Sequence, residues 1–494
     1  MKNSAVPVNR CRCLNDCKVN PDGDFVLYRM LAYRRLGWNF ALQRAAEWAA
    51  ELDKPLVVYE ELALEGPWAS QRSHGFVLDG MRDHLQRAGD LPVCYYPFLE
   101  PEPGAAGALL ETLCELACLL IEDDAPVLNS KGCPAETAAQ RNIAVEAVDS
   151  NGLLPLAAGE KVYPTAYSFR RFLHKELPGH LLEPPAAEPL DQLPVPEACP
   201  LPGQIRETFP PLTLEQLEDR QALLQNLALG RPRPVADRPG GNEAANEQWQ
   251  LFFDDRLEQY PDLRNEPQHR GTSGLSAYLR HGQISVHQIF HELAESQNWS
   301  LQKLGPKPTG KRSGWWGMSG AAEAFLDELV TWRELGYNMA WHEPDDYQSY
   351  TALPDWAKTT LADHADDPRP VLYTFEEFER GATADPLWNA AQHQLLEEGR
   401  IHGYLRMLWG KKILEWSPSP REAAETMIEL NNRYALDGCD PNSYSGIYWC
   451  LGRYDRAWGP ERPIFGKVRY MSSENTARKY QVRDYIRTYD GGGS

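Results

Sequence analysis

The sequence predicts an N-terminal α/β domain with a doubly wound parallel sheet, a long linker, and a C-terminal domain built only of helices. Short apolar runs alternate with amphipathic segments through the first third of the chain, as in parallel sheets covered by helices on both faces. Nine prolines then crowd residues 183–212, which forbids regular helices there. After residue 243 the apolar residues recur with helical spacing, and twelve of the fifteen tryptophans lie after residue 248.

The predicted boundaries follow from these patterns. The α/β domain covers residues 20–182, the proline-rich linker 183–240 with one short helix near 213–229, the helical domain 241–482, and a flexible tail 483–494. Expected N-terminal helices lie at 28–51, 70–88 and 105–117, and expected strands at 55–59, 91–96 and 118–121. Expected C-terminal helices lie at 247–260, 285–296, 321–339, 386–416 and 421–434.

Composition limits the classes of function. No stretch approaches the roughly 18 apolar residues of a membrane span, and residues 1–10 lack the apolar core of a secretory signal. We therefore expect a cytoplasmic protein whose ten cysteines form no disulfides. The net charge of −20 argues against a protein that coats nucleic acid. Between residues 453 and 483, however, eight residues are basic and three are acidic. This local excess of positive charge favours a DNA-binding surface.

Three familiar motifs are incomplete. Residues 305–311 approach a phosphate-binding loop, but Arg312 stands where Ser or Thr must hold magnesium. His287 and His291 share a helix face without a third ligand, so we expect no metal site. No Gly-x-Gly-x-x-Gly follows a predicted strand, which argues against a dinucleotide fold.

A row of tryptophans raises a different possibility. Trp409 and Trp416 lie seven residues apart and so share a helix face. Trp388 lies 21 residues before Trp409. Spacing alone favours core packing for such aromatic residues.

Several long segments point to one family. Residues 385–392, 402–416, 430–442 and 461–470, with 24–42 near the N-terminus, resemble class II cyclobutane pyrimidine dimer DNA photolyases of the photolyase/cryptochrome family. The resemblance runs from about Phe25 to Tyr480. It implies a lyase that uses light to repair pyrimidine dimers, by electron transfer from reduced, anionic FAD to a lesion flipped out of double-stranded DNA. It also implies that the protein acts as a monomer away from membranes.

The same resemblance assigns roles to the cofactor site. Trp409 would lie nearest the flavin, Trp388 next and Trp416 at the surface, as an electron-transfer row. Asn431 would face flavin N5, and Arg406 with Asp437 would form an ion pair beside the ring. The remaining cofactor residues would be Tyr260, Thr272, Ser273, Gly274, Leu275 and Ser276.

For the substrate, the resemblance implies that Glu328 bonds a pyrimidine carbonyl. Trp332 and Trp449 would be the aromatic walls around the flipped bases, with Met407 lining the pocket. Arg456, Trp458 and Arg469 would enter the duplex and contact phosphates.

Departures from the family pattern occur at Gly274, Arg280 and residues 314–319. The N-terminal domain could hold a deazaflavin-type antenna, although no residue requires one. Two alternatives stay open: a cryptochrome-like blue-light photoreceptor without repair activity, and a nucleotide-driven enzyme that uses residues 305–311.

Overall fold

The computed structural model describes residues 4–126, 138, 141–194, 199–227, 229–230 and 232–491. The chain divides into two compact units that alternate along the sequence. The first comprises Met1–Glu160, Glu176–Trp249 and Leu275–Asn298, and the second Lys161–Lys175, Gln250–Gly274 and Trp299–Ser494. No helix in the described part of the chain is long and apolar enough to cross a bilayer.

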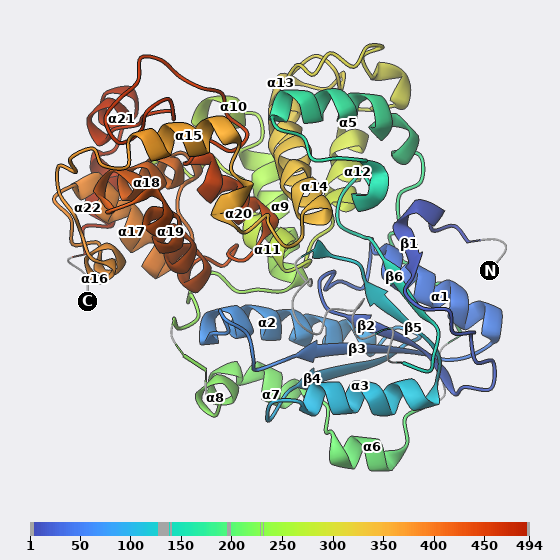
Figure 1. The fold of residues 1–494 in the computed structure, drawn as a ribbon. Coiled ribbons are helices and arrows are strands. Elements are labelled where there is room, and N and C mark those ends of the chain that lie inside the picture. The colour runs from blue at the N-terminus through green and yellow to red at the C-terminus, as the bar shows by residue number, and fades with distance from the viewer. Residues whose placement is uncertain are drawn as a thin grey trace. The chain divides into compact units, whose positions relative to one another are not determined.

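The first unit contains a six-stranded sheet in the order β1-β6-β5-β2-β3-β4 (Figure 1). Only β1 is antiparallel to its neighbour. The strands are β1 (Cys11–Cys13), β2 (Phe25–Met30), β3 (Leu56–Leu62), β4 (Cys94–Leu99), β5 (Ala117–Asp123) and β6 (Val145–Val148). The predicted doubly wound sheet is therefore confirmed. The helix expected at residues 28–51 is wrong at its start, because residues 28–30 belong to β2, a central strand of the sheet.

Apolar residues cover both faces of β2, which explains why it lacks a strand's usual alternation. Val26 and Tyr28 pack in one core with α1 (Phe40–Leu52). Phe25 and Leu27 pack in the other core with α3 (Ala105–Leu116). The two helices thus cover opposite faces of the sheet (Figure 1).

The proline-rich segment is more ordered than the sequence suggests. It forms α6 (Gly203–Thr208), α7 (Leu214–Glu218) and α8 (Arg220–Gln225). Leu217 and Leu224 pack against α2 (Gln71–Ala88). A disulfide joins Cys94 of β4 to Cys199, with Cα atoms 5.1 Å apart. The expectation of free thiols is therefore wrong for this pair, because the fold brings together two cysteines 105 residues apart.

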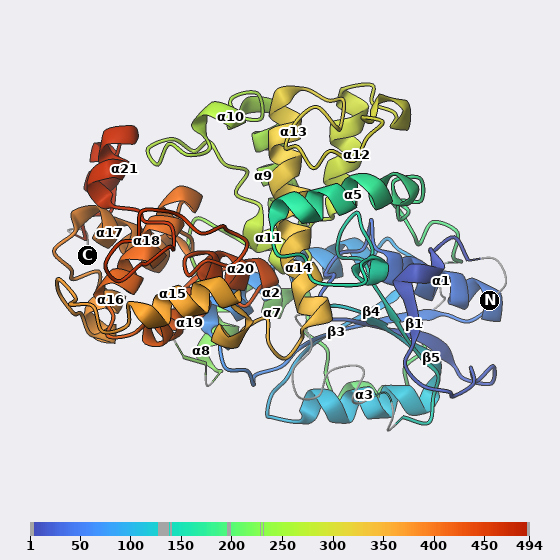
Figure 2. The ribbon, with the colours of Figure 1, turned by 45° about the horizontal axis from the view of Figure 1, so that its top comes forward.

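The helices that follow confirm the helical C-terminal region, and Figure 2 shows α17, α18 and α19 gathered side by side. The expected helix 386–416 is two helices, because Gly399 ends the first in a left-handed conformation (φ 65°). The expected flexible tail contains α22, whose Tyr485 is buried and bonds Gln394. Besides α6–α8, the described α-helices from residue 166 onward are α5 (Ala166–His180), α9 (Asn242–Asp255), α10 (Tyr260–Leu263), α11 (Ser276–Arg280), α12 (Val286–Ser296), α13 (Gly320–Leu326), α14 (Arg333–His342), α15 (Asp355–Asp363), α16 (Phe375–Arg380), α17 (Pro386–Glu398), α18 (Gly403–Trp416), α19 (Pro420–Tyr434), α20 (Pro441–Trp449), α21 (Ser473–Lys479) and α22 (Arg483–Thr488).

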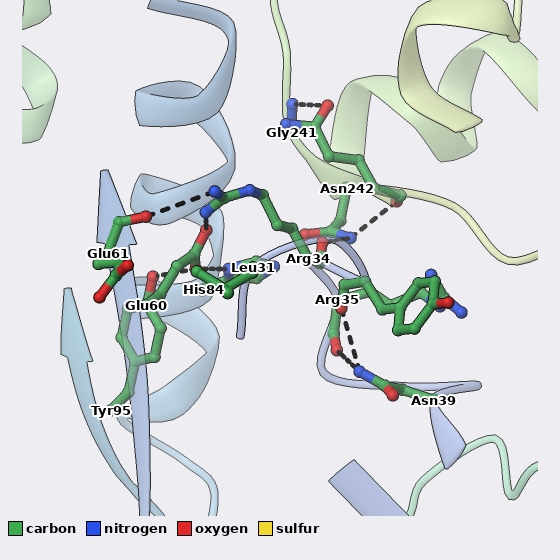
Figure 3. Close-up of polar contacts among 12 residues, drawn as sticks. Leu31, Arg34, Arg35, Asn39, Glu60, Glu61, His84, Tyr95, Gly241 and Asn242 are labelled. Carbon is green, nitrogen blue, oxygen red and sulfur yellow. Dashed lines mark hydrogen bonds and ion pairs between the residues drawn. The ribbon is translucent and has the colours of Figure 1, made fainter. Parts of the chain in front are cut away.

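A buried carboxylate connects the sheet with helix α2 and with the loop that follows β2 (Figure 3). Glu60, near the end of β3, is fully buried. It accepts hydrogen bonds from Arg34 (2.7 Å) and Tyr95 (2.6 Å) and lies 2.7 Å from His84 Nδ1. Burial alone would raise the pKa of Glu60, but His84 and Arg34 lower it to about 2. The carboxylate therefore stays charged in the folded protein.

We expect Glu60→Gln to lower the free energy of unfolding at pH 7 by about 3 kcal/mol, because it leaves the buried Arg34 guanidinium without its carboxylate partner. The folded-state pKa lies below the unfolded one, so the ionised group stabilises the fold above roughly pH 4.5. This contribution disappears as the pH falls toward 2. Urea unfolding of both proteins at pH 7 and pH 3 measures the effect. An equal difference at both values would contradict it.

Candidate active site

Three helices of the second unit approach one another unusually closely through glycines. A Cβ added at Gly336 of α14 would lie 2.8 Å from Ser445 Oγ of α20. One added at Gly410 of α18 would lie 2.6 Å from Cys450 Sγ, at the end of α20. The helix α20 therefore packs closely against both α14 and α18. Met407 of α18 is half-buried there, and its methyl group faces Gly446 of α20.

Glu328 and Trp332 lie in a π-helical turn, Asp327–Trp332 (η5), between α13 and α14. Both side chains are half-exposed, whereas the three residues between them are buried. The predicted common face is therefore present, although the local helix is wider than an α-helix. π-Helical turns of this kind occur often at functional sites.

Glu328 is paired with Arg264, which sequence analysis missed. Arg264 NH1 lies 2.9 Å from Glu328 Oε1, and its guanidinium lies 5.5 Å from the ring centroid of Tyr260. The Glu328 side chain keeps 40% of its exposed area, yet the dense surrounding protein raises its pKa, with Arg264 acting against the rise. Arg264 lies four residues after Tyr260 in the sequence, but this spacing does not indicate that Arg264 pairs with Glu328.

Trp449, half-buried on α20, is flanked by two cations. The Arg469 guanidinium lies 5.2 Å from its ring centroid, and Lys411 Nζ lies 5.0 Å from it. Lys411 is fully buried and donates a hydrogen bond to the Cys450 carbonyl (2.7 Å). Burial lowers the pKa of Lys411 to about 8. This arrangement fixes the indole in an electropositive environment.

Asp455 organises the residues expected to contact DNA. It accepts two hydrogen bonds from Arg469 (2.9 and 3.1 Å) and one from Trp458 Nε1 (3.2 Å). Arg469 and Arg456 lie 4.2 and 4.5 Å from the Trp458 ring centroid. Burial would raise the pKa of Asp455, but Arg469 and the other donors lower it overall. The chain Trp449–Arg469–Trp458–Arg456 is therefore one connected set of rings and cations.

Polar groups that could hold a flavin lie on α18, on α19 and just beyond it. Arg406 and Asp437 form a two-fold ion pair (2.9 and 3.1 Å). The Arg406 Nε is buried and has no partner among the described residues. Asn431 is 3% exposed, and its amide donates to Asn432 Oδ1 (3.2 Å). A buried donor with no partner and a buried amide fit a polar ring system such as FAD.

The other predicted cofactor residues are divided between the two units. Tyr260 is buried on α10 of the second unit. Thr272, Ser273 and Gly274 end a segment of that unit, whereas Leu275 and Ser276 begin a segment of the first. Gly274 has a φ of 72°, which explains glycine at this departure from the family pattern.

The three tryptophans are brought together. Trp388 stacks parallel to Trp409, with ring centroids 6.4 Å apart, and meets Trp416 edge-on at 5.9 Å. Trp388 Nε1 donates to the Trp409 carbonyl (3.0 Å). Trp416 is only 6% exposed, so its expected place at the surface is wrong. Tyr373 covers it (5.4 Å between ring centroids) and is itself half-exposed.

Comparison with known proteins identifies the family. No family model matches the chain. Deoxyribodipyrimidine photo-lyase of Methanothermobacter thermautotrophicus is 33% identical over 97% of this chain and 98% of its own length. That of Arabidopsis thaliana is 32% identical over 93% and 88%. The fold is similar to that of a class III photolyase from Agrobacterium tumefaciens (TM-score 0.65, 17% identity, 96% and 87% coverage).

The chain belongs to the deoxyribodipyrimidine photo-lyases of the photolyase/cryptochrome family. It is an enzyme of that class, a lyase that acts in DNA repair. Members of this family generally bind FAD. DNA is the substrate that the relatives imply.

We expect Asp455→Ala to weaken binding of UV-damaged duplex about tenfold, roughly 1.4 kcal/mol. The substitution removes the carboxylate that holds Arg469 and Trp458 in place. Fluorescence anisotropy with a labelled duplex measures the dissociation constant. Asp345→Ala removes the same charge from an exposed loop position and is the control. Equal affinities of the two variants would show that Asp455 does not organise this surface.

Proposed function

We propose that the protein is a class II enzyme that repairs cyclobutane pyrimidine dimers with light, by electron transfer from reduced FAD to a flipped-out lesion. The observation that supports this proposal is that Glu328 and Trp332 lie half-exposed in a π-helical turn that continues into α14, a helix packed closely on α20, which carries Trp449. A polar carboxyl group beside aromatic walls is what two splayed pyrimidines require.

Glu328 would meet the lesion with its carboxyl group. Because its pKa is raised, the carboxyl group keeps a proton at higher pH than an exposed glutamate. A protonated carboxyl can donate a hydrogen bond to a pyrimidine carbonyl. Arg264, at 2.9 Å, orients the same carboxyl. Trp332 and Trp449 enclose the bases from two helices, and the cations around Trp449 favour negative charge on the bound lesion.

The flavin would be held by residues of α18 and α19 and the turn after them. When bound, FAD supplies light absorption and one-electron chemistry. The Arg406–Asp437 pair would place a positive and a negative group beside the ring, and the buried Asn431 amide would face it. Tyr260 and the Thr272–Gly274 segment would meet the phosphates and ribityl chain. A deazaflavin-type antenna in the first unit stays a prediction.

Arg456, Trp458 and Arg469 would occupy the space that the flipped bases leave in the duplex. The stacking among these side chains supports this role, because it holds cations and an indole in one rigid group. Phosphate contacts from arginine make such binding dependent on salt.

Glu328→Ala and Trp449→Ala should each lower the rate of light-dependent repair about tenfold or more, since a buried hydrogen bond or aromatic contact contributes roughly 1–3 kcal/mol. The measurement is recovery of pyrimidine absorbance in a UV-damaged oligonucleotide under blue light, with reduced enzyme. Glu258→Ala, at an exposed position, is the control. Flavin binding without repair in the parent protein would instead support the photoreceptor alternative.

Trp388→Phe should slow photoreduction of bound FAD by roughly tenfold while repair by chemically reduced enzyme stays within about twofold. Phenylalanine keeps a smaller aromatic ring at this buried position, and that ring is far harder to oxidise than an indole. Absorbance changes under illumination with reductant measure the first rate, and the repair assay the second. Trp341→Phe, at a half-exposed position, is the control. Photoreduction as fast as in the parent protein would show that the tryptophan row serves core packing and not electron transfer.

A further inference from the structure

A groove of about 560 Å³ lies at the outer end of the tryptophan row. Its apolar floor is formed by Leu372, Tyr373, Phe375 and Phe378. Two floor residues contact the row directly. Tyr373 lies 5.4 Å from Trp416, and Phe378 lies 5.4 Å from Trp388 and nearly parallel to Trp416 at 6.5 Å. The groove is therefore separated from Trp416 by a single layer of aromatic rings.

One wall of the groove is acidic. Glu422, Glu425 and Glu429 follow one another along one side of α19 and line the groove. Glu429 is paired with Arg433. Glu422 and Glu425 are exposed, and neither has an arginine or lysine partner among the described residues. The residues described as lining the groove include these three carboxylates and no basic side chain. The nearby Arg433 guanidinium lies 5.5 Å from the Phe375 ring centroid, but it is paired with Glu379 and Glu429.

We propose that this groove binds an aromatic organic cation that donates the electron which restores the oxidised tryptophan row. The apolar floor accepts a flat or rounded ring system, and the carboxylates select positive charge. One electron leaves the bound donor and reduces the tryptophan radical cation to neutral tryptophan. The donor departs in its one-electron oxidised form, and no proton transfer is needed. This inference rests on the electron-transfer row of the proposed function.

Electrostatics would also exclude competing donors. An anionic reductant must approach Glu422 and Glu425 before it reaches the rings of the floor. Charged walls of this kind change association rates by about 10- to 1,000-fold at low salt. The effect weakens as the Debye length falls to roughly 8 Å at physiological salt. The whole chain carries a net charge of −20. The effect of Glu422 and Glu425 on the choice of donor must therefore be separated from the effect of the net charge.

Two ferrocene derivatives with opposite charges test the proposal. The donors are (ferrocenylmethyl)trimethylammonium and ferrocenecarboxylate, and the variants are Glu422→Gln/Glu425→Gln and the control Glu397→Gln/Glu258→Gln. Glu397 and Glu258 are exposed and lie outside the groove lining, so both double variants change the net charge equally. After a laser flash on the FAD-loaded protein, decay of the tryptophan radical is followed against donor concentration. In parallel, isothermal titration calorimetry measures binding of each donor to the FAD-loaded protein in dim light.

We expect the cationic donor to react about tenfold faster than the anionic one at low salt. This ratio should fall to about twofold in Glu422→Gln/Glu425→Gln and stay unchanged in the control variant. Binding of the cationic donor should weaken about fivefold only in the groove variant. Equal ratios and equal binding in the two double variants would overturn the proposal. Absence of any tryptophan transient would overturn the electron-transfer row and this donor role with it, whereas the binding titration still decides whether the groove takes the cation.

Discussion

The close approach of α20 to α14 and α18 is the constraint on which the site depends. It requires Gly336 and Gly410, because a Cβ at either position would lie within 3 Å of a side-chain atom of the facing segment. The approach brings Met407 of α18 against Gly446 of α20, the helix that ends at Trp449, and the π-helical turn with Glu328 and Trp332 continues into α14.

Each of three cations in the candidate site is held by a fixed polar partner. Arg264 is held by Glu328, Arg469 by Asp455, and Lys411 by the Cys450 carbonyl. Each partner limits the movement of a long side chain, so little reorganisation is needed when an anionic substrate arrives. In the proposed function, a small preorganised surface of this kind would let a protein of net charge −20 bind DNA locally.

The tryptophan row connects the buried interior of the helical unit with its acidic groove. Trp388 and Trp409 are buried and parallel, Trp416 is turned relative to them, and Tyr373 is half-exposed. Phe378 packs on both Trp388 and Trp416, which holds the ring geometry from the outside. The same aromatic contacts thus stabilise the fold and define where an external donor can approach.

The sequence by itself determined the doubly wound sheet, the helical second half and the tryptophan spacing, since these depend on local periodicity and residue order. Only the tertiary structure decided that residues 25–30 form a strand, because burial on both faces removes the alternation that identifies one. It also decided the burial of Trp416, the Cys94–Cys199 disulfide and the partners Arg264, Lys411 and Asp455. These features join residues far apart in the chain, and no local pattern encodes which distant groups the fold will bring into contact.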